Sequence, residues 1–223
     1  MAAAAEDNAI DTRDLFIITL MAKGLLRQSE VVAARRVDLS LEPRPPSAKP
    51  GDLLCLVVRK GKGTTEPHQR WVRAVVGPES LKRVCPVYWW RRYEPFRNGA
   101  EPALVQPHDS DAMVARARGE PCGGLANGTI NSMVKRRAAE GLAGNYGSHS
   151  LRRSGATHAA ARGVAREVLE AAGHWARQSR AMERYIVPSR ERILEVGDAF
   201  RLNDSADSVT TAAAAGRLVV LNP

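Results

Sequence analysis

Apolar residues near the start of the chain follow the three- and four-residue spacing of an amphipathic helix. They are Leu15, Ile18, Ala22 and Leu25. Asp11 or Thr12 is expected to cap this helix, because each side chain offers an oxygen to the first free backbone N–H groups. A second helix is expected over 28–36, after a break around Gly24.

Two apolar runs further along the chain predict a β-hairpin. LLCLVV (53–58) and RWVRAVV (70–76) have strand-like composition, and the glycine-containing RKGKG segment between them is typical of a turn. The preceding LEPRPPSAKPGD (41–52) is rich in proline and cannot continue a helix. One small antiparallel sheet is therefore expected.

Helical patterns dominate the rest of the chain. Pro86 is expected to open a short helix ending at Tyr93, because proline is favoured in a first helical turn. Residues 94–126 have no clear pattern. Asn127 is expected to cap a helix that ends near Gly141. Its inward-facing residues are Ile130, Met133, Val134 and Ala138. Further helices are expected at about 150–162, 165–172, 178–186 and 189–201.

These elements predict a mainly α (α+β) fold with one small antiparallel β-hairpin or sheet. A single domain is expected over 11–200, after a flexible lead at 1–10 and before a polar, alanine-rich tail at 201–223. No internal repeat is found. The most apolar stretch, 15–26, is too short and interrupted to cross a bilayer, and no signal peptide is expected.

The net charge of +9 and the pI near 10.0 favour an acidic partner, nucleic acid before membrane. Most of the cations are arginine, whose planar fork suits phosphate. A GC-rich genome would give the same bias. The three cysteines show no CxxC spacing, so reduced thiols in an intracellular protein are expected, without a zinc site.

The segment SHSLRRSGATHAAARG (148–163) carries candidate chemistry. His149 and Arg152 are one helical turn apart and share a face, so both can donate hydrogen bonds to one target. Ser148 or Ser150 is a suitable N-cap, and a helix start favours an anion. A phosphate is the natural target.

Three other segments hold polar residues that fit this chemistry. LLRQSEVVAARRVDL (25–39) places Glu30 three residues after Arg27 and Asp38 at its far end. GHW (173–175) places His174 after a glycine that ends a helix, and ERYIVP (183–188) contains Tyr185.

These segments resemble the boxes of the tyrosine recombinase (phage integrase) family. Arg27, Glu30 and Asp38 match the first box. The second box is H-x-L-R followed by A-T-H, and residues 149–158 match it. Gly173-His174 matches the third box. Tyr185 corresponds to the nucleophile, although its distance of eleven residues from His174 exceeds the family's usual interval. HSLRRSGAT and CPV (85–87) are most similar to integrases of eukaryotic tyrosine-recombinase mobile elements and their viral relatives.

The resemblance implies a role for each matched residue in a reaction that uses fixed cations and needs no metal or cofactor. The implied catalytic residues are Arg27, Lys62, His149, Arg152, His174 and Tyr185. The arginines would clamp the phosphate, the histidines would donate hydrogen bonds, Tyr185 would attack, and Lys62, on the hairpin turn, would protonate the leaving oxygen. Supporting roles fall to Glu30 and Asp38, and contacts with the DNA backbone to Lys60 and Arg153.

The resemblance covers 12–190 and implies double-stranded DNA as the partner, a homo-tetramer on DNA, no membrane, and an intracellular location with DNA. The family's N-terminal DNA-clamping domain has no counterpart, so a fragment or an unusually short protein is expected. Two alternatives remain open. One is a truncated or domesticated DNA-binding module that no longer cuts, and the other is a type IB topoisomerase.

Overall fold

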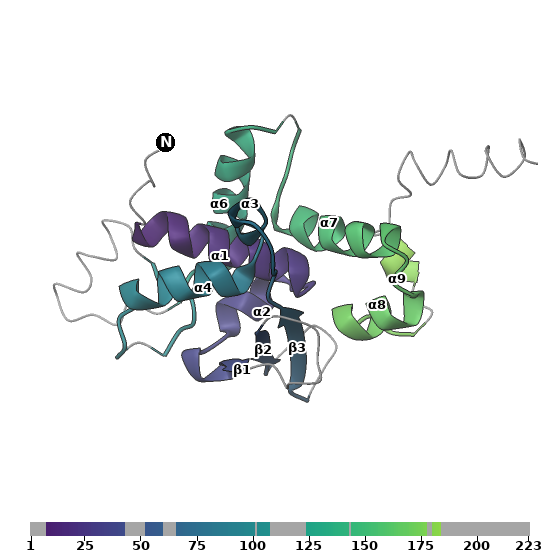
Figure 1. The fold of residues 1–223 in the computed structure, drawn as a ribbon, viewed down its shortest axis with the longest axis horizontal. Coiled ribbons are helices and arrows are strands. Elements are labelled where there is room, and N and C mark those ends of the chain that lie inside the picture. Colours follow the sequence, from purple (N-terminus) through teal and green to yellow (C-terminus); the bar gives the residue numbers. More distant parts are fainter. Residues whose placement is uncertain are drawn as a thin grey trace, which may run out of the picture.

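Helix α1 (Ala9–Lys23) lies at the centre of the fold and packs against α4, α7 and α2 (Figure 1). The computed structural model describes residues 8–42, 52–59, 66–100, 102–107, 124–142, 144–177 and 180–183. The other elements are α2 (Gln28–Ala33), the 3₁₀ helix η1 (Arg36–Asp38), β1 (Leu39–Glu42), β2 (Leu53–Val58), β3 (His68–Arg73), α3 (Glu79–Lys82), α4 (Pro86–Tyr93), η2 (Glu94–Phe96), α6 (Asn127–Ala139), α7 (Ser148–Ala161), α8 (Arg166–Gly173) and α9 (Arg180–Glu183). The expected class, mainly helical with a small antiparallel sheet, is confirmed.

The beginning and the buried face of α1 differ from the prediction. Asn8 is the N-cap, and its Oδ1 accepts a hydrogen bond from the Asp11 backbone at 2.7 Å. The fully buried apolar side chains are Phe16, Ile17, Leu20 and Met21. The expected Leu15, Ile18 and Ala22 are only half-buried. A helix covered by neighbours on several sides buries more than one apolar stripe, so the single-face spacing misplaced its centre.

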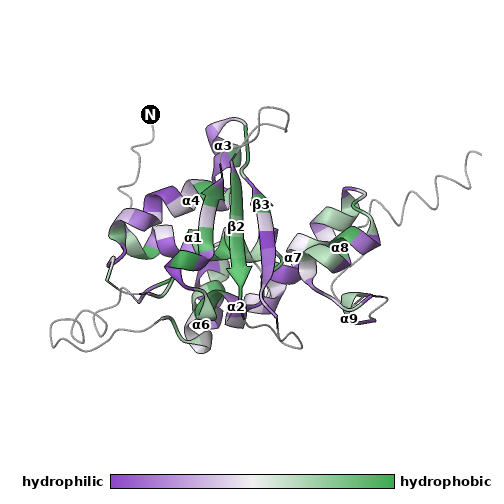
Figure 2. Ribbon diagram, turned by 90° about the horizontal axis from the view of Figure 1, so that it is seen from below, coloured by the Kyte–Doolittle hydropathy of each residue, from purple (hydrophilic) through white to green (hydrophobic). Residues whose placement is uncertain are grey.

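The sheet has the order β1-β2-β3 with antiparallel pairing throughout. The hairpin of β2 and β3 is confirmed, with Leu54 opposite Val72. Strand β1 was not predicted; it pairs with β2, with Leu39 opposite Leu56. The expected helix over 28–36 is wrong at its end, because Arg35 forms a bridge with Ala103 and the chain then turns into η1. Figure 2 shows β2 as an apolar strand between its partners.

Several helices follow their predicted bounds. Helix α4 runs over the predicted 86–93, with Pro86 in its first turn, and the four inward residues predicted for α6 are all buried. The caps differ, because Ala126 precedes α6 and Gly147 precedes α7. The expected helix at 189–201 and the tail lie outside the described residues.

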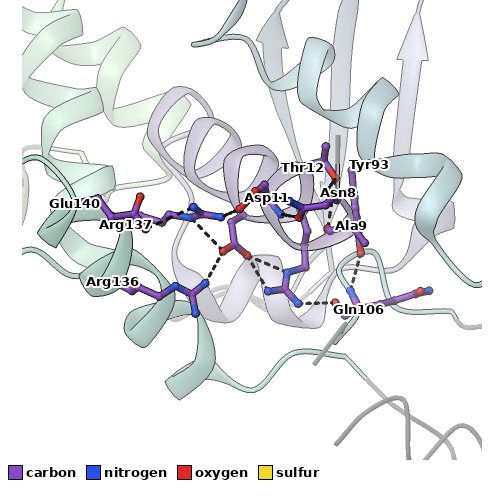
Figure 3. A network of polar contacts seen from close by, with 11 residues as sticks. Asn8, Ala9, Asp11, Thr12, Tyr93, Gln106, Arg136, Arg137 and Glu140 are labelled. Carbon is purple, nitrogen blue, oxygen red and sulfur yellow. Dashed lines mark hydrogen bonds and ion pairs between the residues drawn. The ribbon is translucent and has the colours of Figure 1, made fainter. Parts of the chain in front are cut away.

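The charged side chains between α1 and α6 form a network around Asp14, whose carboxylate is fully buried. Asp14 Oδ1 lies 2.8 Å from Arg13 Nη2, and its Oδ2 lies 2.8 Å from Arg136 Nη2. Figure 3 shows Arg136 and Arg137 reaching from α6 toward α1, where Arg137 also pairs with Asp11. A buried carboxylate needs such compensation, so the network fixes α6 against α1.

Helices α7, α8 and α9 have a small apolar core of their own, which joins the rest of the fold at the end of α1. It consists of Leu25, Ala156, Ala160, Leu169 and Met182. Gly155 brings α7 so close to α1 that a Cβ at this position would overlap the carbonyl oxygen of Ala22. In the part of the chain that the structure describes, no helix is long and apolar enough to cross a membrane.

Because this contact is with backbone, we expect Gly155→Ala to lower the free energy of unfolding by about 1–2 kcal/mol. The overlap costs about 1–3 kcal/mol and outweighs the gain of at most about 1 kcal/mol in helix propensity. Urea unfolding followed by circular dichroism measures the change. Gly128→Ala in α6 is the control, because nothing lies within 4 Å of its added Cβ. Equal stability of the two variants would contradict the close α1–α7 contact.

Candidate functional site

Four segments that are distant in the sequence meet at one corner of the fold. They are the turn after α1, strand β3, the first half of α7 and the end of α8 (Figure 1). Their arginine and histidine side chains converge there, and we refer to Arg27, Arg70, Arg152, His68 and His174 as the cationic corner.

Arg152 bonds the α1 end to the α8 end. Its side chain is almost fully buried; Nη1 donates to the carbonyl of Leu25, and Nη2 donates to the carbonyl of Gly173 at 2.6 Å. The guanidinium carbon lies 4.1 Å from the centroid of the Trp175 ring, a cation–π distance. The arginine of the second box thus holds the third box in place.

The end of α8 is built around Gly173 and His174. Trp175 N donates to Glu170 O at 2.9 Å and His174 N to Ala171 O at 3.2 Å, the bonds of a Schellman end. His174 has a φ of 54°, in the left-handed region where glycine is usual. A Cβ on Gly173 would overlap the Trp175 ring, so any other residue here would displace that ring from its place over Arg152. The strained backbone sets the direction of the His174 imidazole.

A second left-handed residue lies across the corner. Leu25 has a φ of 50°, directly after the Gly24 cap of α1. Its carbonyl is the one that accepts Arg152 Nη1, and its side chain packs in the α7–α9 core. A left-handed leucine costs about 1–2 kcal/mol, which these contacts offset.

Arg27 and Glu30 form a partly buried pair at the start of α2. Glu30 Oε1 lies 2.8 Å from Arg27 Nη1, and Oε2 accepts from the Arg27 backbone N–H at 2.8 Å. Glu30 is fully buried, whereas the Arg27 side chain is 21% exposed. The spacing of the first box therefore has a local cause: the acid caps the helix that begins after the arginine.

Arg70 on β3 was missed by the sequence reasoning. It is 2% exposed, its Nη1 donates to Ala172 O, and its Nη2 donates to Gly173 O at 3.1 Å. Its Nη2 also lies 3.8 Å from Glu30 Oε1. Burial, opposed by Glu30, lowers the pKa of Arg70 to about 10, so the guanidinium is charged at neutral pH. The sequence did contain a signal for Arg70, because an arginine inside a predicted strand has to face either solvent or a site.

Two histidines meet beside Arg70. The rings of His68 and His174 have centroids 3.8 Å apart with 38° between their planes. Desolvation, followed by the charge of Arg70, lowers the pKa of both imidazoles below the ordinary 6.5. Both rings are therefore mainly neutral at pH 7, and a neutral imidazole carries one N–H donor.

The corner carries an excess of positive charge. Arg27 and Arg70 share one carboxylate, that of Glu30, and the contacts described for Arg152 are with two carbonyls and an indole. Buried cations favour an anion, and guanidinium groups pair best with phosphate or carboxylate. The described residues contain no group of three or more His, Cys, Asp or Glu side chains that could hold a metal ion.

The structure describes three of the other predicted residues, His149, Arg153 and Asp38. His149 and Arg153 are exposed in the first half of α7. Asp38 is buried in η1, where it accepts from Arg59 Nε at 2.6 Å and so fixes the end of β2. Lys60, Lys62 and Tyr185 lie outside the described residues.

Comparison with known proteins gives likenesses of structure. No family model and no curated protein matches the sequence. The chain is similar to the crystal structure of XerA recombinase (TM-score 0.55, 16% identity, covering 90% of this chain and 65% of that one). It is also similar to the XerH site-specific recombinase bound to its difH substrate before cleavage (TM-score 0.54, 15% identity) and to palindromic difH after cleavage (TM-score 0.57, 18% identity).

Each XerH comparison covers 90% of this chain and 48% of the XerH chain. The chain therefore spans about half to two thirds of the length of these recombinases. At 15–18% identity, the likeness shows that the chain has the fold of the corresponding part of these proteins.

We expect Arg70→Met to raise the pKa of both His68 and His174, because the substitution removes the charge that lowers both values. A histidine NMR titration measures this. The matched control is Arg73→Met, on the opposite, exposed face of β3, which should leave both values unchanged. In the unsubstituted protein the unfolded chain binds protons at higher pH than the folded one. These two groups therefore lower the free energy of unfolding as pH falls below about 6.5. Unchanged titration in Arg70→Met would contradict this electrostatic coupling.

Proposed function

We propose that this protein is the catalytic domain of a site-specific DNA recombinase of the tyrosine recombinase family. The observation that carries the proposal is the cationic corner, where guanidinium groups from three separate segments surround the imidazole of His174 in a recombinase fold. A phosphodiester resists attack because its transition state places more negative charge on the non-bridging oxygens. Preorganised cations stabilise that charge without solvent reorganisation.

The proposed reaction is a reversible exchange of phosphodiester bonds. The Tyr185 oxygen attacks the phosphorus, the bond to the 5′ oxygen breaks, and Lys62 gives that oxygen a proton. Tyr185 loses its own proton and becomes joined to the 3′ phosphate. The 5′-hydroxyl of a second strand then reverses the step, which rejoins the DNA without a metal or a nucleotide.

Exposure divides the roles within the corner. Arg27 is partly open to solvent, and His174 is exposed at the α8 end, so these two would meet the phosphate directly. Arg152 and Arg70 lie behind them and supply buried positive charge, and the five N–H groups of each guanidinium allow a phosphate contact beside the carbonyl bonds. His149, one turn before Arg152, would complete the donors, and Glu30 would orient Arg27.

The finer parts of the proposal rest on the resemblance and on charge. Double-stranded DNA is the proposed partner, with Lys60 and Arg153 on its backbone, and a tetramer on DNA is the proposed assembly, inside the cell where DNA is. The tail at 201–223 is proposed to pass between protomers. HSLRRSGAT and CPV support an integrase of a eukaryotic mobile element or virus.

We expect Tyr185→Phe to abolish covalent attachment to DNA while leaving DNA affinity nearly unchanged, because only the attacking oxygen is removed. Nicked duplexes of mixed sequence, incubated with the protein and separated on a denaturing gel, show the attachment as a slower, protease-sensitive band. Tyr146→Phe is the matched control and should keep the band. Tyr93 is a poor alternative nucleophile, because its buried hydroxyl accepts a hydrogen bond from the Gln106 backbone.

A band that persists in Tyr185→Phe would place the nucleophile elsewhere. Binding of all variants without any band would instead favour the DNA-binding module that no longer cuts.

We expect Arg27→Met to slow single-turnover cleavage about 100-fold, which corresponds to the roughly 3 kcal/mol that one preorganised donor contributes. Arg35→Met removes an equal charge from an exposed side chain nearby and should change the rate little. Quenched-flow or manual time courses with enzyme in excess provide the rates. Equal rates in the two variants would remove Arg27 from the site.

A further inference from the structure

His68 has no part in the reaction as proposed above, yet it lies inside the cationic corner. It is the first residue of β3, and strand alternation places it on the same inward face as Arg70, two residues later. The outward face of the strand carries Gln69, Trp71 and Arg73, which are all exposed. The 3.8 Å ring contact with His174 therefore follows from the register of the strand.

The nitrogens of the His68 ring are poorly paired: the backbone of Glu66 is the one hydrogen-bonding group that acts on the ring, and it ranks last among the influences on its pKa. Nδ1 and Nε2 are both buried, and among the described residues neither makes a hydrogen bond of normal length and angle. Buried polar atoms are almost always paired, and leaving one unpaired costs about 1–3 kcal/mol. Such a group at the edge of a site indicates a ligand that supplies the missing bond.

The surroundings of His68 determine the charge of that ligand. The charged and titratable groups that act on its ring are Arg70, His174 and Glu30, together with the backbone of Glu66. Desolvation and Arg70 lower the pKa of His68, so the ring is neutral and has one N–H to donate. The neighbouring guanidinium repels a cation and attracts an anion. An oxygen of a phosphate group satisfies both conditions.

We propose that His68 is a further phosphate-binding residue of this site, which donates a hydrogen bond to a non-bridging oxygen of the bound phosphate beside His174. The proposal rests on the proposed function for the identity of that phosphate as a DNA phosphodiester. The two imidazoles, whose rings are in tilted contact, then present neighbouring N–H groups to one ligand, and β3 takes part in the site through a residue that follows Lys62 closely in the sequence.

Two substitutions distinguish the contribution of the His68 nitrogens from that of its aromatic ring. His68→Phe keeps an aromatic ring against His174 and removes both nitrogens, whereas His68→Ala removes ring and nitrogens together. We expect both variants to cleave a nicked duplex about 100-fold more slowly in single turnover, with DNA binding retained. Gln69→Ala, one residue away on the exposed face, is the control and should cleave at the wild-type rate. A wild-type rate in His68→Phe would overturn the proposal.

A second measurement does not depend on cleavage. Long-range ¹H–¹⁵N NMR spectra resolve the imidazole nitrogens of the five histidines, and inorganic phosphate is the probe. We expect saturable shifts at His68 and His174 together, and about 10-fold weaker phosphate binding in His68→Phe. No shift at His68 when His174 is saturated, or no shift at either, would overturn the proposal. If the signals of His68 and His174 shift together but the protein never forms a covalent link to DNA, the phosphate site is supported and the proposed recombinase function is rejected.

Discussion

The guanidinium of Arg152 is the group on which the geometry of the corner depends. It donates to the carbonyl of Leu25 and to the carbonyl of Gly173, the residues at the ends of two helices that are far apart in the sequence. The backbone is left-handed at Leu25 and at His174, directly after Gly173. Neither turn is favourable for a residue with a side chain. The buried arginine offsets both costs, and by doing so it sets the positions of Arg27 and His174.

A buried arginine is costly in isolation, so its partners matter as much as its charge. Arg152 and Arg70 both donate to Gly173 O, and this carbonyl lies at the negative end of the α8 dipole. In the contacts described, backbone dipoles and the Glu30 carboxylate stabilise these charges, and the three guanidinium groups of the corner outnumber that carboxylate. A site with this balance is folded and still prepared for an anion, because a full set of carboxylates would have neutralised it.

The sequence predicted the elements whose signals are local. Pro86 marked the start of α4, and the apolar spacing of α6 was confirmed because only one face of that helix is buried. The face of α1 was misplaced because three elements cover it. Strand β1 was missed because the alternation of LSLE lasts only four residues and runs into the proline-rich segment that was assigned to a loop. Tertiary packing determined these features, and single-sequence spacing does not contain it.

The residues of the site also divide into those that the sequence predicted and those that it missed. Arg27, Glu30, Arg152 and His174 could be found because each belongs to a short motif with fixed spacing, whereas Arg70 and His68 belong to a strand whose inward face the sequence left ambiguous. Hydropathy favours Trp71 as the buried residue of β3, yet Trp71 is 44% exposed and Arg70 is 2% exposed. The carbonyls of Ala172 and Gly173 reverse that preference, since they solvate the guanidinium in place of water. A polar residue becomes an inward residue only where the partner segment presents acceptors, and that partner lies about one hundred residues further along the chain.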